Sequence, residues 1–75
     1  MIIATIAADT YTITRAGQDI YDVLAAMSDA SQDDRAWQDR IRMIMMDVDT
    51  LSIRDICRRY GIAITIIPDA AIGRV

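Results

Sequence analysis

The spacing of apolar residues changes twice along this chain, and these changes limit the possible fold more than any other feature. Residues 10–15, "TYTITR", alternate threonine with apolar side chains, as a β-strand does. From residue 18 to residue 60 apolar residues recur every three or four positions, which is typical of amphipathic helices. After Gly61 the segment "IAITII" returns to alternation. The chain is therefore expected to be α+β, in the order ββαααβ, with a small antiparallel or mixed sheet and the helices packed on one face.

The two ends of the chain are expected to form one sheet. "MIIATIA" and "TYTITR" are rich in β-branched residues and flank "ADT", so they predict a hairpin, and Gly17 is expected to break its second strand. The last strand, residues 62–67, is expected to be buried and to join the hairpin, because a lone strand has no partner for its backbone. Such a sheet has two edges and no lysine to protect them, which favours dimers formed by strand addition.

Three apolar stripes predict the three helices. They consist of Ile20, Val23, Leu24 and Met27, then Trp37, Ile41, Ile44, Met45 and Val48, then Ile53, Ile56, Cys57 and Tyr60. Asp19 is expected in the first turn of the first helix, and Ser31 with Asp34 has capping-box spacing for the start of the second. Ser52 is expected to open the third helix and Gly61 to end it.

The core must hold this chain without covalent or metal cross-links. Its 75 residues predict a single small domain, 1–75. Cys57 is the only cysteine and histidine is absent, which excludes an internal disulfide and a Cys/His zinc site. A hydrophobic content of 53% favours dense packing aided by self-association, and a homodimer is expected.

Most residue types that carry catalysis are missing, so the chain is predicted not to be an enzyme and to need no cofactor or metal. There is no histidine, lysine or glutamate, and the three glycines are isolated, so no phosphate-binding loop is present. The aspartates of residues 29–34 lack the spacing of a calcium loop. Cys57 is flanked by Arg58 and Arg59, which would lower a thiol pKa. It lies on an apolar stripe and has no histidine base, however, so a buried structural cysteine is favoured.

Residues 52–62, "SIRDICRRYGI", resemble the first helix and turn of helix-turn-helix regulators, with a small residue four positions before Gly61 and arginines on the exposed side. The resemblance implies a small DNA-binding regulator. The following "AITIIPD" opposes it, because a recognition helix begins with polar residues and Pro68 would fall in its interior. The net charge of −3 also opposes it. Direct nucleic-acid binding is therefore the disfavoured alternative.

Charge is divided unevenly between the two halves of the chain. Residues 1–34 carry one arginine and six aspartates, a net charge of −5, whereas residues 35–75 carry seven arginines and five aspartates, a net charge of +2. Two candidate contact faces follow: an acidic one of Asp19, Asp22, Asp29, Asp33 and Asp34, and a basic one of Arg54, Arg58 and Arg59. The alternative for the arginines is a solvated face on which Asp55 pairs with Arg59.

Met43 and Met46 of the second helix are expected to point partly away from the core and to leave apolar surface on an otherwise charged helix. Methionine side chains adapt to partners, and an exposed apolar patch bordered by arginine and aspartate is typical of a protein interface. The alternative is burial against a second copy of the chain. Both interpretations imply that this surface contacts another protein chain.

We interpret the sequence as a non-enzymatic protein-binding module. The class that fits best is a phage or mobile-element inhibitor of a host defence or nucleic-acid-handling complex, acting by steric or charge occlusion as anti-CRISPR and anti-restriction proteins do. A DNA-binding regulator and a structural subunit that assembles through sheet edges are the alternatives. A cytoplasmic location is expected, because the chain has one free thiol, no basic N-terminal region and no apolar run of roughly 20 residues.

Overall fold

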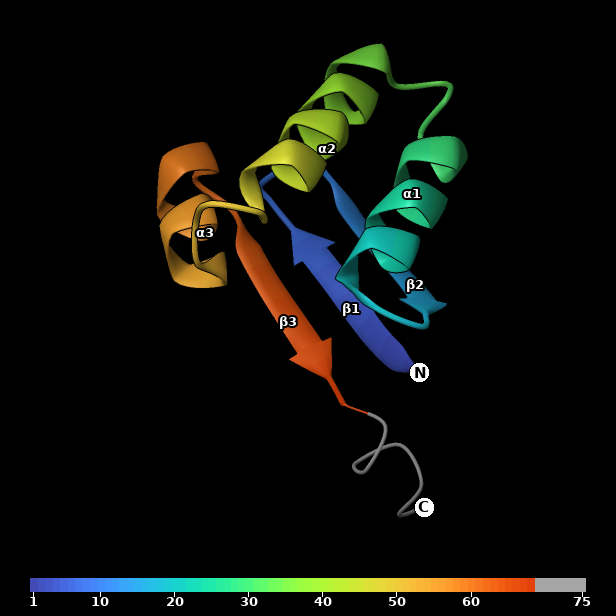
Figure 1. Cartoon of the computed structure of the whole chain (residues 1–75). Coiled ribbons are helices and arrows are strands. Elements are labelled where there is room, and N and C mark those ends of the chain that lie inside the picture. The colour runs from blue at the N-terminus through green and yellow to red at the C-terminus, as the bar shows by residue number, and fades with distance from the viewer. Residues whose placement is uncertain (69–75) are drawn as a thin grey trace.

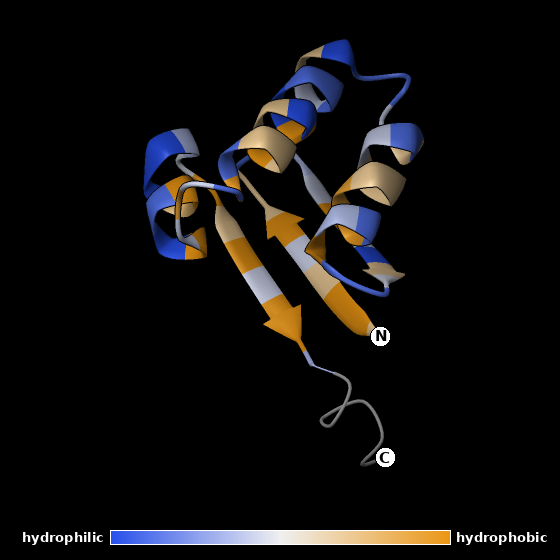
Figure 2. Ribbon diagram, in the orientation of Figure 1, coloured by the Kyte–Doolittle hydropathy of each residue, from blue (hydrophilic) through white to orange (hydrophobic). Residues whose placement is uncertain are grey.

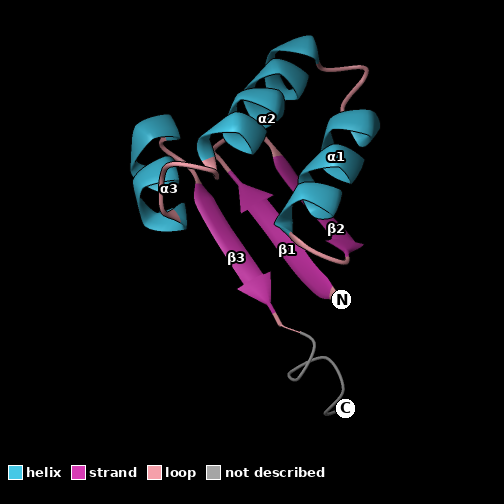
Figure 3. Ribbon diagram, viewed as in Figure 1, coloured by secondary structure: helices cyan, strands magenta, loops and turns pink. Residues whose placement is uncertain are grey.

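The computed structural model describes residues 1–68 and has the element order expected from the apolar spacing (Figures 1 and 3). The elements are β1 (Ile2–Ala7), β2 (Thr12–Gly17), α1 (Ile20–Ala30), α2 (Arg35–Asp47), α3 (Ile53–Tyr60) and β3 (Ala63–Ile67). The α+β prediction, in the order ββαααβ, is therefore confirmed.

The three strands form one antiparallel sheet in the order β2-β1-β3. β1 lies in the centre, and its Thr5 is paired with Thr14 of β2 on one side and Thr65 of β3 on the other. The prediction that the last strand joins the N-terminal hairpin is confirmed, and the sheet is antiparallel rather than mixed. β2 ends at Gly17, as the sequence predicted, and Gly17 itself is still paired with Ile2.

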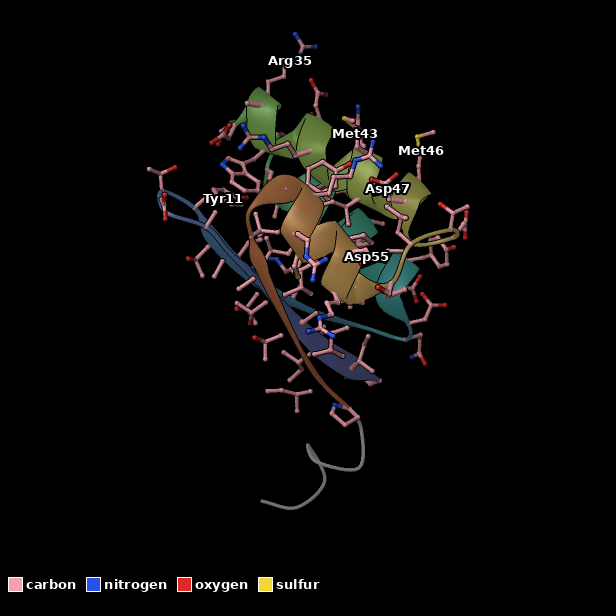
Figure 4. All side chains as sticks on the ribbon, turned by 90° about the vertical axis from the view of Figure 1, so that its left-hand side faces the viewer. Tyr11, Arg35, Met43, Met46, Asp47 and Asp55 are labelled. Carbon is pink, nitrogen blue, oxygen red and sulfur yellow. The ribbon has the colours of Figure 1, made fainter. Side chains whose placement is uncertain are left out.

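All three helices lie on one side of the sheet and leave the other side uncovered (Figures 1 and 4). Ala4 and Ile6 of β1 are buried beneath the helices. Their cross-strand neighbours point to the same face, since paired residues of adjacent strands share a face. The buried apolar core consists of Ala4, Ile6, Ile13, Val23, Leu24, Met27, Trp37, Ile41, Ile44 and Ile56. The helical stripes read from the sequence supply most of these side chains.

β3 is not the buried strand that its sequence predicted. Its residues are exposed except for Ile64, which is half-buried, although the strand carries hydrophobic residues along its length (Figure 2). The reason is its position, because β3 is an edge strand and α1 contacts β1 and β2 instead. The main helical contact of β3 is with α3. Alternating side chains show that two faces of a strand differ, but not whether a helix covers either face.

The helix ends agree with the sequence in α3 and differ from it in α1 and α2. Ser52 is the N-cap of α3, and its hydroxyl accepts the Asp55 N–H at 3.2 Å. Gly61 ends the same helix in the left-handed region, with φ 65°, where glycine has no steric penalty. Asp19, expected in the first turn of α1, is its N-cap instead. The second helix begins one turn later than the Ser31 capping box predicted: Asp34 is its N-cap, while Ser31 is the C-cap of α1.

Candidate protein-binding surfaces

The acidic candidates do not form one cluster. Asp19 and Asp22 lie at the start of α1, whereas Asp29 lies in its last turn and Asp33 and Asp34 follow its other end. An α-helix rises about 1.5 Å per residue, so the 11 residues of α1 place the two groups roughly 15 Å apart.

Three of these five carboxylates are engaged in holding helix ends. Asp19 accepts the Asp22 N–H at 2.9 Å, and Asp22 in turn accepts the Gln18 N–H at 3.3 Å. Asp34 accepts the Trp37 N–H at 3.2 Å. Asp29 and Asp33 are exposed, and within the described part of the chain their side chains make no hydrogen bond. All five aspartates are thus exposed, but three of them are held in place by the helix ends.

The exposed side of α2 carries the two methionines. Met43 is 50% exposed and Met46 is 74% exposed, so the prediction that both point away from the core is confirmed. Both side chains project from the outer side of the helix (Figure 4). Asp39 and Arg42 are exposed on the same helix, each four residues before one of the methionines. We call these four residues, Asp39, Arg42, Met43 and Met46, the methionine face.

The first half of α2 is fixed to the hairpin by aromatic stacking. The rings of Trp37 and Tyr11 are stacked, with centroids 4.7 Å apart and planes at 13°. The guanidinium carbon of Arg40 lies 4.9 Å from the centroid of the Trp37 ring, a cation–π contact. The Tyr11 hydroxyl is hydrogen-bonded to the buried Ser31 hydroxyl. Sequence reasoning missed both partners of Trp37, because nothing in the apolar spacing brings Tyr11 to α2.

Two further hydrogen bonds hold α2 along its length. The Gln38 side-chain amide donates to the Ser28 carbonyl of α1 at 3.0 Å. At the other end the Tyr60 hydroxyl of α3 donates to the Asp47 carboxylate at 2.5 Å. This bond, together with partial burial, raises the pKa of Tyr60 above its usual 10.0, and the nearby Arg59 opposes the shift. The sequence indicated Tyr60 only as part of an apolar stripe, although a partly buried tyrosine usually finds a polar partner.

The basic candidates lie together on α3. Arg54, Arg58 and Arg59 are all exposed. The expected pair between Asp55 and Arg59 does not form among residues 1–68, and Arg59 instead lies with its guanidinium carbon 6.0 Å from the centroid of the Tyr60 ring. The helix-turn-helix resemblance ends at Gly61, because β3 occupies the place of a recognition helix.

Cys57 is half-buried on α3, rather than fully buried as expected. Its carbonyl accepts N–H groups of Gly61 and Ile62, so its backbone takes part in the end of the helix. The described residues contain no group of three metal-ligating side chains. Residues 1–68 contain no helix that is long and apolar enough to cross a membrane.

The chain was compared with protein-family models, with curated proteins and with solved structures. None of the three comparisons finds a match. The functional argument therefore depends on the surfaces described above.

Proposed function

We propose that this chain is a non-enzymatic protein-binding module that contacts its partner through the methionine face. The observation that carries the proposal is the exposure of Met43 and Met46 together on one side of α2. Their flexible thioether side chains suit adaptable apolar contact, and Asp39 and Arg42 supply the polar border that protein interfaces have.

The attachment of α2 supports this role. Stacking of Trp37 on Tyr11 and the hydrogen bonds of Gln38 and Asp47 fix the helix at both ends. A helix that is already ordered loses less conformational freedom when it binds than a mobile segment does. The methionine face is thus presented on a rigid support.

The finer proposal is that the module inhibits a host defence or nucleic-acid-handling complex, for the benefit of a phage or mobile element, by covering a working surface of that complex. Asp29 in the last turn of α1 and Asp33 just before α2 support it, because both are exposed and would add negative charge toward the N-terminal end of α2. Negative charge at that position favours a partner with a basic surface, as nucleic-acid-handling proteins have.

The test replaces both methionines with charged residues. Wild-type chain and the double variant Met43→Glu/Met46→Glu would be immobilised and exposed to a lysate of the organism that carries the gene. Proteins retained by the wild type alone would be identified, purified and titrated calorimetrically. We expect the double variant to bind the purified partner at least about tenfold more weakly. The matched control is Tyr21→Glu/Ala25→Glu, which adds the same charge at exposed positions of α1 and should bind as the wild type does.

Equal binding of the purified partner by the wild type and the methionine double variant would overturn the proposal. DNA binding is tested separately, by a mobility shift with duplex DNA at physiological salt. Clear binding that is lost in Arg54→Ala/Arg58→Ala would favour the DNA-binding alternative over a protein partner.

A further inference from the structure

The two edges of the sheet differ in how well they are protected. β2 carries Arg15, which is exposed and donates to the Thr14 carbonyl of its own strand at 2.7 Å. β3, "AITII", has no charged residue and no proline, two features by which natural proteins commonly protect an exposed strand edge. In an antiparallel edge strand, every second residue directs its N–H and C=O away from the neighbouring strand. No hydrogen bond to these outward groups of β3 is formed by residues 1–68.

We infer that β3 pairs antiparallel with β3 of a second copy about a two-fold axis at Thr65, giving a continuous six-stranded sheet. This inference depends on β3 and is independent of the methionine face. In this register Thr65 meets Thr65 of the second copy, Ile64 meets Ile66, and Ala63 meets Ile67. Every pair is uncharged and four of the five residues are β-branched, which suits cross-strand packing. Pro68 lacks an N–H and ends the ladder on each side.

The position of α3 favours a second copy over an unrelated strand. Ile66 is paired with the buried Ala4 and so lies on the face that carries the helices, yet it is 37% exposed. α3 lies at the start of β3, on its outer side and on the same face of the sheet (Figures 1 and 4). Antiparallel pairing brings the start of one β3 beside the end of the other. Each α3 would then cover the exposed Ile66 side chain of the second copy. An unrelated strand would carry no helix in that position, so Ile66 would stay exposed.

The same geometry avoids charge repulsion. Arg54, Arg58 and Arg59 all belong to α3, and antiparallel pairing places the two copies of α3 at opposite ends of the joined strands. The paired strands themselves are uncharged, so no like charges face each other across the axis. The contact is short, with five residues on each side, so we expect a weak association, with a dissociation constant on the order of tens of micromolar.

A cysteine at the axis tests the register directly. In a Cys57→Ser background, Thr65→Cys places two thiols directly opposite each other, with Cβ atoms about 5 Å apart. Mild oxidation should give a disulfide-linked dimer. Thr12→Cys is the matched control, because Thr12 is also an exposed strand threonine but lies in β2 at the other edge. Cross-linking of both variants to the same extent would overturn the proposed pairing.

Sedimentation measurements on the unmodified chain and on Thr65→Lys test the association without a cross-link. The unmodified chain should pass from monomer to dimer between about 1 μM and 1 mM, and two lysines facing each other at the axis should raise the dissociation constant about tenfold or more. Thr12→Lys should leave it unchanged. A monomer throughout this range, or an equal response of both lysine variants, would overturn the inference. Circular dichroism confirms that each variant is folded.

Discussion

The N-terminal unit of this protein, residues 1–47, supplies most of the buried core, whereas the unit formed by α3 and β3 supplies little of it. Among the described residues, ten apolar side chains are buried, and Ile56 is the only one that α3 and β3 contribute. In the N-terminal unit α1 packs against both β1 and β2 and also against α2, whereas the main helical contact of β3 is with α3. The stability of the fold should therefore depend mainly on the first unit, while the second leaves apolar surface for partners.

A pair of truncations in the two units should give the largest difference. Ile41 of α2 is fully buried, and Ile41→Ala should lower the free energy of unfolding by about 3–4 kcal/mol, since it removes buried methyl groups and leaves a cavity. Ile64 of β3 is half-buried, and Ile64→Ala should cost about 1 kcal/mol. Urea unfolding followed by circular dichroism measures both. Equal losses would show that the α3–β3 unit is packed as tightly as the other.

Adding one methyl group to a glycine of each unit should also have different effects on stability. A Cβ on Gly17 would lie 2.8 Å from the Cβ of Asp22 and 2.9 Å from the backbone nitrogen of Val23. Gly17→Ala should therefore force α1 away from β2 and cost about 2–3 kcal/mol. Gly61 has open space around it but a φ of 65°, so Gly61→Ala should cost only about 1 kcal/mol of backbone strain. The same unfolding measurement tests both, and a larger loss at Gly61 would contradict this account.

The same two units also show what could be read from the sequence. The helical period places Met43 and Met46 opposite Ile41 and Ile44, so the exposed face of α2 could be predicted from spacing alone. The ends of α3 were predicted because Ser52 directly precedes Ile53, the first residue of the apolar stripe, and Gly61 directly follows Tyr60, the last. Between α1 and α2 several residues can cap a helix, and local sequence did not distinguish Ser31 from Asp34.

The pairing of β3 with the hairpin could be predicted, but side-chain contacts between distant segments could not. Stacking of Tyr11 on Trp37 depends on how the hairpin turn meets α2, and no local pattern records that. The exposure of β3 depends on its place at the edge of the sheet, while α1 packs against β1 and β2. Both are consequences of tertiary packing, and both decide which surfaces a partner can reach.

The smallest predicted effect concerns the hydrogen bond that joins the two units. Tyr60→Phe removes the donor to Asp47 and should lower the free energy of unfolding by about 1 kcal/mol at pH 8. Tyr21→Phe is the control, because Tyr21 is an exposed tyrosine on α1 and its replacement should cost less than about 0.5 kcal/mol.

This bond should also weaken in alkali, since hydrogen bonding to Asp47 raises the pKa of Tyr60 above its usual 10.0 in the folded chain. The folded state then holds the phenol proton more tightly than the unfolded state. The contribution of the Tyr60–Asp47 hydrogen bond to stability is full below about pH 10 and is lost as the pH rises through the raised pKa. The difference in free energy of unfolding between wild type and Tyr60→Phe, measured by urea unfolding, should therefore be smaller at about pH 11 than at pH 8. Tyr21→Phe should lose as much stability between these pH values as the wild type does. An equal difference in free energy of unfolding between wild type and Tyr60→Phe at both pH values would show that the phenol proton does not stabilise the contact between α3 and α2.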